Sequence, residues 1–178
     1  MIRQKTLKNS IKCRGVGLHT GKRVNLTLRP APANKGIVFF RTDVSPTERI
    51  AAHCGNVTST DLSTTIATGQ TRPSVATIEH LMSAFKGLGI DNAYVDVDGP
   101  EVPIMDGSAG PFVFLIQSAG IVEQDKFKRT VRIKKAYTYK RGDSFIRIEP
   151  YNGFKIDYSI DFNHPVFKDK PASVSLDF

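Results

Sequence analysis

Glu79 and His80 stand side by side in the segment ATIEH, residues 76–80, and together they could perform acid–base or metal chemistry. A carboxylate can take a proton from water, and a neutral imidazole nitrogen is a common metal ligand. The apolar residues around the pair recur at helical spacing, and they define a core face that excludes both Glu79 and His80. Two interpretations therefore stay open: a solvent-exposed polar pair on a helix, or a general base beside a metal ligand.

The residues near His80 do not form a self-contained zinc motif. The pattern HExxH would need a histidine at 76 or 84, where alanines stand, and HxxEH would need one at 77, where Thr77 stands. No H-x-x-x-D pattern occurs either. Catalytic zinc sites usually combine three protein ligands with a water. A metal bound by His80 must therefore take its other ligands from distant sequence; the remaining histidines are His19, His53 and His164.

The elements that must position this pair follow an α+β pattern. Alternating or continuous apolar residues predict strands over 24–28, 36–40 and 93–97. A helix is predicted from about Pro73 to Lys86, with Ser74 as its cap and Gly87 as its stop. A second helix is predicted over about 108–119, ending at Gly120, and Asp106 is a candidate for its cap. We expect a two-layer sandwich in which both helices cover one face of a sheet.

The later part of the chain shows strand patterns only. The charged segment EQDKFKR, 123–129, predicts a linker, and strict alternation predicts a strand through Phe154, Ile156, Tyr158, Ile160 and Phe162. A strand–Pro–Gly–strand order recurs near 28–40 and 148–162, which hints at duplication. The sequence thus predicts a complete α+β domain over 1–122, and over 130–178 the mostly-strand first half of a second similar domain.

Composition indicates a folded, soluble, cytoplasmic protein. Apolar residues make up 40% of the 178 residues and charged residues 24%, while the two cysteines make no disulfide framework. The net charge of +8 is uneven: residues 126–178 hold 12 Lys and Arg against 6 Asp and Glu, whereas residues 1–125 hold 13 against 11. Such a basic part suits anionic partners such as a nucleotide or diphosphate, or it is a solvated surface. Nucleic acid is disfavoured because no reader motif or basic-aromatic cluster is present.

Several long motifs occur in order along the chain. They are GVGLHTG (15–21), LTLRPAPANKGIVFFRTD (26–43), TIEHL (77–81), GLGIDNAYVDVDGPEVPIMDGSAGPF (87–112) and IDFNHP (160–165). Together they resemble the zinc-dependent UDP-3-O-acyl-N-acetylglucosamine deacetylases of lipid A synthesis in Gram-negative bacteria. The resemblance implies a zinc cofactor and a UDP-linked acylated amino sugar as substrate. It also implies a cytoplasmic enzyme with no nucleic acid partner and at most peripheral membrane contact.

The resemblance implies roles at matching positions. Glu79 matches the general base that activates water, and His80 matches the first zinc ligand. Leu62 and Ser63 fall in a loop that lies beside the metal in the family, where a cysteine is common at the position of Ser63.

Four further residues are of interest, and for three of them a structural interpretation is also open. His19 lies in the turn that lines the family's site, or it is a turn residue outside the chemistry. Asp161 and Phe162 match residues that contact the uridine end of the substrate, although Phe162 is also the last apolar member of an alternating strand. Asp106 lies in the motif PIMDGSAGP, and its structural interpretation is the cap of the second helix.

Two departures from the family pattern bear on function. Ser144 stands where many members carry a basic residue for the diphosphate, and Arg141 and Arg147 are the candidate substitutes. The family's other zinc ligands, a lysine that polarises the substrate carbonyl and a second catalytic histidine lie beyond residue 178. We therefore expect the N-terminal portion of such an enzyme, inactive alone without the missing C-terminal half. The alternative is a non-catalytic basic module for nucleotide binding or assembly.

Overall fold

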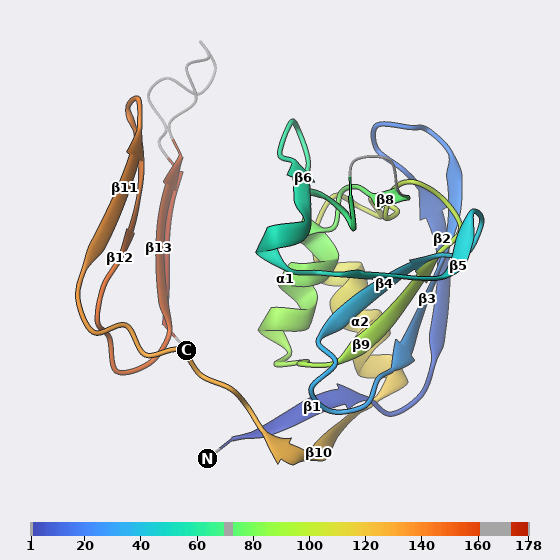
Figure 1. The fold of residues 1–178 in the computed structure, drawn as a ribbon, viewed down its shortest axis with the longest axis horizontal. Coiled ribbons are helices and arrows are strands. Elements are labelled where there is room, and N and C mark those ends of the chain that lie inside the picture. Colours follow the sequence, from blue (N-terminus) through green and yellow to red (C-terminus); the bar gives the residue numbers. More distant parts are fainter. Residues whose placement is uncertain (1, 70–72, 161–171, 178) are drawn as a thin grey trace. The chain divides into compact units, whose positions relative to one another are not determined.

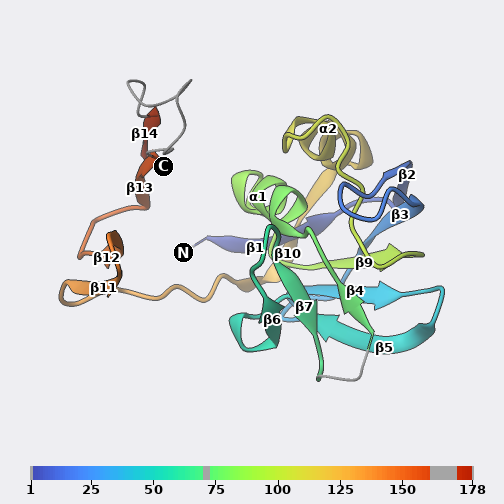
Figure 2. The same ribbon diagram turned by 90° about the horizontal axis from the view of Figure 1, so that it is seen from above.

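The computed structural model describes residues 2–69, 73–160 and 172–177, which divide into two compact units, Met1–Lys128 and Arg129–Phe178. The first unit is a two-layer α+β structure, in which α1 and α2 cover one face of a five-stranded sheet (Figures 1 and 2). The sheet has the order β2-β3-β9-β4-β5, and β4 and β9 are parallel whereas the other neighbours are antiparallel. None of the helices in the described ranges is long and apolar enough to cross a membrane.

The elements of the first unit have the following bounds. The five-stranded sheet consists of β2 (Ile11–Val16), β3 (Arg23–Pro30), β9 (Ala93–Val97), β4 (Ile37–Arg41) and β5 (Ser45–Ala51). Two smaller sheets consist of β1 (Arg3–Leu7) with β10 (Ile121–Phe127), and of β6 (Val57–Ser59), β7 (Thr65–Ala67) and β8 (Ser74–Val75). The helices are α1 (Glu79–Gly87), α2 (Gly110–Ala119) and a short 3₁₀ turn at Cys54–Asn56.

The core lies between the sheet and the two helices. Alternate residues of β3 and β9 point into it, since Val24, Leu26 and Val97 are each 0% exposed. Helix α1 contributes Leu81 and Phe85 at helical spacing. Helix α2 contributes residues of the same kind, Phe112, Ile116 and Ala119. The strands predicted over 24–28, 36–40 and 93–97 and the second helix are thereby confirmed.

The start of the first helix differs from the prediction. Helix α1 begins at Glu79 and not near Pro73, because Ser74 and Val75 form β8 and Ala76 makes a parallel bridge with Glu101. Ser74 is therefore a strand residue and not a helix cap. Thr77 then has a φ of 57°, a left-handed conformation that turns the chain from the bridge into the helix.

The segment predicted as a linker, 123–129, is largely part of strand β10. This strand pairs antiparallel with β1, so that Leu7 lies opposite Ile121 and Arg3 opposite Phe127. The Gln124 side chain also donates to Ala31 O at 2.9 Å and accepts from the Asn92 side chain at 2.8 Å. The polar sequence is compatible with a strand because its partner β1 is almost as polar and both strands lie at the edge of the unit.

The second unit consists of two strand pairs. They are β11 (Tyr137–Arg141) with β12 (Ser144–Ile148), and β13 (Lys155–Ile160) with β14 (Ala172–Asp177). No side chain described in this unit is buried, and apolar residues such as Phe145, Ile156 and Leu176 are 66%, 41% and 46% exposed. The alternation predicted for 154–162 appears in β13 as far as Ile160. Phe162 lies outside the described residues.

Candidate functional site

The Glu-His pair occupies the first two positions of α1, and both residues are half-buried. Glu79 Oε2 accepts a hydrogen bond from Thr64 N at 3.1 Å, and Ile78 N donates to Thr64 O at 3.4 Å. A carboxylate in the first turn is favoured by the unpaired N–H groups at a helix N-terminus. Among the described residues, Glu79 Oε1 has no hydrogen-bond donor, so one oxygen is anchored and the other is available for chemistry.

The loop before Thr64 brings two predicted residues beside Glu79. Leu62 and Ser63 directly precede the residue that donates to the carboxylate. Leu62 is 89% exposed and has a φ of 56°. A bulky residue held in this conformation is uncommon and stores local strain. An exposed leucine at such a position is a candidate contact for an apolar ligand.

Asp106 lies in the turn before α2, within electrostatic range of His80. Hydrogen bonds from the Ser108 N–H and hydroxyl hold the pKa of Asp106 below its usual range, and His80 has a smaller electrostatic effect in the same direction. Both groups donate to Asp106 Oδ1 at 2.8 Å. The prediction that Asp106 caps α2 is wrong, because it closes a turn instead and Ser108 Oγ accepts from the first helical residue, Gly110, at 3.1 Å.

His19 lies on an exposed turn, and the structure fixes its backbone. Gly17 N donates to Lys22 O at 2.9 Å, and Gly21 N donates to Gly17 O at 3.0 Å. His19 N donates to both carboxylate oxygens of Glu101, at 3.1 and 3.2 Å. The turn that carries His19 is therefore held by a residue that lies 82 positions later in the sequence.

Sequence reasoning missed Glu101, whose side chain is 0% exposed. Burial raises its pKa, but hydrogen bonds from His19 N–H, the Thr77 hydroxyl and Thr20 outweigh that effect and leave the pKa below its usual value. The one available signal was a carboxylate in PEVP, between two prolines and next to the apolar Val102. That pattern is equally typical of an exposed turn.

The described residues do not assemble a complete metal site. No group of three or more His, Cys, Asp or Glu side chains within 2–69, 73–160 and 172–177 lies close enough to hold a metal ion. His80 is one candidate ligand, but a catalytic zinc usually takes three from the protein. The donor set formed by these residues alone therefore does not fit zinc.

The candidate residues of the second unit that the structure describes, Arg141, Ser144 and Arg147, are all exposed. Ser144 begins β12 opposite Arg141, and Arg147 is engaged by Glu149 through an ion pair and a 2.7 Å hydrogen bond from Nε. Arg147 is thus the weaker substitute for the basic residue that the family carries. Asp161 lies outside the described residues, as does Phe162.

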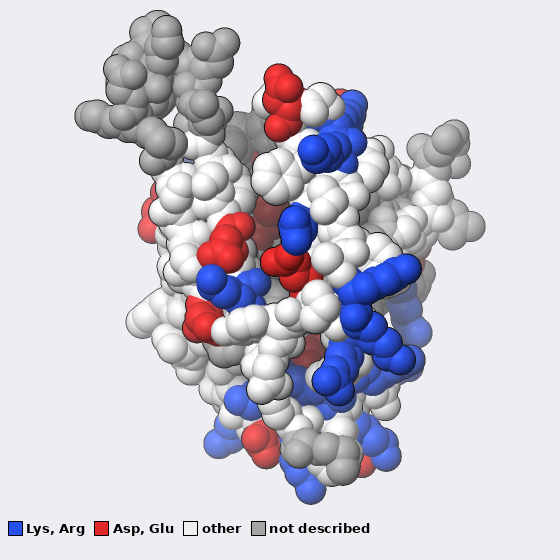
Figure 3. Space-filling model, turned by 90° about the vertical axis from the view of Figure 1, so that its left-hand side faces the viewer, with Lys and Arg blue, Asp and Glu red and all other residues white. Residues whose placement is uncertain are grey.

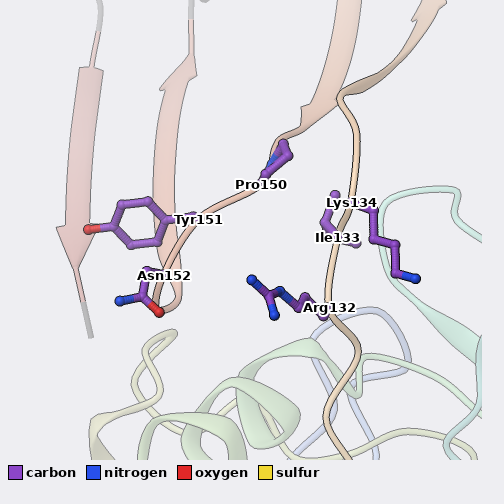
Figure 4. A pocket seen from close by; sticks show the side chains of 6 residues that line it. All are labelled: Arg132, Ile133, Lys134, Pro150, Tyr151 and Asn152. Atoms are coloured by element: carbon purple, nitrogen blue, oxygen red, sulfur yellow. The ribbon is translucent and has the colours of Figure 1, made fainter.

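An open hollow of about 550 Å³ lies within the second unit (Figure 4). Its lining residues are Arg132, Ile133, Lys134, Pro150, Tyr151 and Asn152. The Tyr151 hydroxyl donates to Asp177 Oδ2 at 2.5 Å, and this interaction raises the pKa of Tyr151. The hollow has a basic edge, but every lining residue except Ile133 is exposed.

Basic side chains are concentrated near the start of the second unit. The segment 126–135 contains six Lys and Arg residues and no Asp or Glu. In the view of Figure 3, Lys and Arg side chains lie beside one another, with Asp and Glu side chains between them. Lys128 is already engaged, because its Nζ lies 3.0 Å from Asp91 Oδ2 and donates to Gly89 O at 2.9 Å.

Comparison with known proteins gives a consistent result. A family model described as UDP-3-O-acyl N-acetylglycosamine deacetylase (LpxC) matches residues 4–178. Proteins named UDP-3-O-acyl-N-acetylglucosamine deacetylase from Teredinibacter turnerae, Thioalkalivibrio sulfidiphilus and Coxiella burnetii are 59%, 57% and 53% identical to the chain over 178 residues. Each alignment covers 100% of this chain and 58% of the relative's length. Matched by the family model along nearly its whole length, the chain belongs to the UDP-3-O-acyl-N-acetylglucosamine deacetylase family.

Proposed function

We propose that this chain carries the general base and one metal ligand of a zinc-dependent deacetylase that removes acetate from UDP-3-O-acyl-N-acetylglucosamine in lipid A biosynthesis. Family membership supports the reaction class. The geometry of Glu79 is the observation that carries the assignment of roles, since Oε2 is anchored by Thr64 N–H and Oε1 has no donor in the described residues. The enzyme works in the cytoplasm under this proposal.

Glu79 acts on water in the proposed reaction. Its carboxylate accepts a proton as the water oxygen attacks the acetamide carbonyl, and the carbon–nitrogen bond then breaks. Acetate leaves, and the sugar nitrogen takes up a proton to become the free amine. The hydrogen bond from Thr64 holds the carboxylate through Oε2 and leaves Oε1 to accept the proton.

His80 contributes to the metal site and does not complete it. Zinc, when bound, would lower the pKa of water and polarise the carbonyl. His80 would hold it together with ligands from outside the described residues, because these offer no set of three. The chain spans 58% of the length of the relatives it matches, and the rest of that length is the proposed source of these ligands and of the remaining catalytic groups.

Contacts with the substrate are proposed on both units. Contacts near the reacting group are proposed for Leu62, Ser63 and His19. Leu62 and Ser63 directly precede Thr64, whose N–H bonds to Glu79, and His19 N bonds to Glu101. Asp161 and Phe162 are proposed for the uridine end. Arg141 is the proposed source of a diphosphate contact, since Arg147 is engaged by Glu149.

Substitution of Glu79 tests this function. In a whole-length protein, built by adding the remaining part of a relative's sequence, Glu79→Gln should lower deacetylation of UDP-3-O-acyl-N-acetylglucosamine by at least about 100-fold. Bound zinc, measured by elemental analysis, should stay at the wild-type level because the ligands are intact. Ser83→Ala, on the exposed side of the same helix, is the control and should retain activity. Wild-type turnover by Glu79→Gln would remove Glu79 from the mechanism.

A further inference from the structure

Glu101 is a buried carboxylate whose hydrogen-bond donors are all uncharged groups. Oε1 accepts from His19 N at 3.1 Å and from Thr77 Oγ1 at 2.9 Å. Oε2 accepts from Thr20 N and Thr20 Oγ1, both at 3.0 Å. Five hydrogen bonds in all thus converge on a side chain that is 0% exposed, because His19 N also reaches Oε2 at 3.2 Å.

These donors come from two segments that are far apart in sequence. One is the turn at Gly17–Lys22, which carries His19, and the other is Thr77, two residues before Glu79. A single oxygen, Oε1, accepts from both segments, so the His19 amide and the Thr77 hydroxyl lie within reach of the same atom. Glu101 is therefore the physical link between the turn and the start of α1.

The backbone around Glu101 holds the same segment. Ala76 N donates to Pro100 O at 2.9 Å, and Val102 N donates to Ala76 O at 3.0 Å. Thr77 follows in its left-handed conformation and is 2% exposed. A β-branched residue stays in that conformation only when its surroundings determine it, and the hydroxyl bond to Glu101 is the side-chain part of that constraint.

A carboxylate at this place is held by its donors. Burial removes its hydration, and the hydrogen bonds from His19, Thr20 and Thr77 compensate for that loss. The space is also closely fitted, since a Cβ at Gly17 would lie 2.4 Å from Glu101 Oε2. A buried carboxylate that four donors hold through five hydrogen bonds joins the two segments next to the candidate site, which points to a role in placing that site.

We propose that Glu101 is a positioning residue. By bonding to both Thr77 and the turn that carries His19, it fixes where helix α1 begins and thereby the orientation of Glu79. The inference rests on the proposed function for its catalytic consequence. The link itself is a structural property of this chain, and it has a separate test.

The structural test uses amide NMR on the 178-residue chain. In Glu101→Gln, the amide signals of His19 and Thr20 should move, and so should that of Thr64, which contacts Glu79 and not Glu101. The control is Thr6→Val, which removes a different buried hydroxyl that donates to Asn92 O at 2.7 Å and accepts from Ala31 N at 3.1 Å. Thr6→Val should leave the Thr64 amide in place. An unmoved Thr64 amide in Glu101→Gln would overturn the coupling.

The catalytic test uses the whole-length protein well below its unfolding temperature. Glu101→Gln should lower kcat at least about tenfold, while KM changes less than about threefold and bound zinc stays at the wild-type level, because misplacement of a reacting group acts mainly on kcat. Thr6→Val should lower the stability of the fold without touching the candidate site, and it should therefore keep the wild-type kcat. Equal kcat for Glu101→Gln and wild type, or an equal loss in Thr6→Val, would show that Glu101 has only a structural role.

A second pair of variants decides the matter if Glu101→Gln does not fold. Thr77→Val removes the hydroxyl at almost constant volume and should lower kcat several-fold. Thr77→Ser keeps the hydroxyl and should recover most of that loss. The same loss in both variants would overturn the proposal. An inactive wild-type protein would instead refute the proposed function, and the NMR comparison would still decide whether Glu101 couples the two segments.

Discussion

At Gly17 the space available is smaller than one methyl group. A Cβ there would lie 2.4 Å from Glu101 Oε2 and 2.5 Å from Thr20 Oγ1. Gly17→Ala should therefore lower the free energy of unfolding by about 1–3 kcal/mol, since either the carboxylate or the turn must move. Urea denaturation monitored by circular dichroism would measure the difference.

A matched control is available at the end of α1. A Cβ at Gly87 would meet nothing within 4 Å, and alanine restricts the unfolded chain more than glycine does. Gly87→Ala should leave stability unchanged or raise it by up to about 1 kcal/mol. Equal effects of the two substitutions would contradict the close fit at Gly17.

The carboxylate of Glu101 should also make stability depend on pH. Its pKa is lowered in the folded chain, so the ionised form stabilises the fold above the unfolded pKa of about 4.3. This contribution is lost as the pH falls below about 5 toward the folded pKa. The difference in unfolding free energy between wild type and Glu101→Gln should therefore be largest near neutral pH and shrink on acidification.

Urea denaturation of both proteins at several pH values between 7 and 4 would measure this trend. Asp43 and Asp106 also have lowered pKa values, but both titrate in the two proteins alike and cancel in the difference. A difference that stays constant across this range would show that folding does not lower the pKa of Glu101, and a difference that grows on acidification would show that the folded chain favours the protonated form.

At the scale of the elements, β10 completes the first unit. It pairs with β1, and Gln124 and Lys128 bond to Ala31 O and Asp91. A chain ending at residue 128 should therefore fold with a sharp thermal transition. A chain ending at residue 120 should melt at a lower temperature, by roughly 5 °C or more, because each lost kcal/mol lowers Tm by several degrees in a unit of this size.

Calorimetry or circular dichroism on the two shortened chains would decide this point. Substitution of Gln124 and Lys128 by alanine in the longer chain is the intermediate control, since it keeps the strand pairing and removes the side-chain bonds. If the two shortened chains melted together, β10 would be a passive extension, as the linker prediction assumed.

The elements that could be predicted from sequence are those in which the spacing of apolar residues matches the buried face. In β3 and β9 alternate residues are buried, and the pattern of Val24, Leu26 and Leu28 shows this directly. The start of α1 could not be predicted, because it depends on the bridge between Ala76 and Glu101 and on the left-handed Thr77. Strand β10 was missed because its pairing with the polar strand β1 leaves little apolar periodicity to detect.

The candidate site divides in the same way. Glu79 and His80 could be proposed from their adjacency and from the motif around them. Glu101 could not, because its role arises where His19 and Thr77 converge from 82 and 24 residues away. Local periodicity carries no information about such a meeting point.

For the whole molecule, the two units should differ in local stability. The first has a closed apolar core, whereas no described side chain of the second is buried. Hydrogen exchange on the isolated chain should therefore show strong protection from β3 to α2 and weaker protection across β11–β14. Dilute samples are needed, since exposed apolar side chains such as Phe145 favour association. Equal protection in a dilute monomer would show that the later strands are stable without a core of their own.

The antiparallel pairing of β1 with β10 also determines how the first unit responds to mechanical load. Arg3 lies opposite Phe127, so the two ends of the unit leave the sheet at the same place. A force that pulls residues 2 and 128 apart acts at one end of this strand pair. It would break the hydrogen bonds between β1 and β10 one after another and would not load all of them at once. The strands would peel from Arg3 toward Leu7 at low force, while the core behind Leu7, which is 0% exposed, would yield only afterwards.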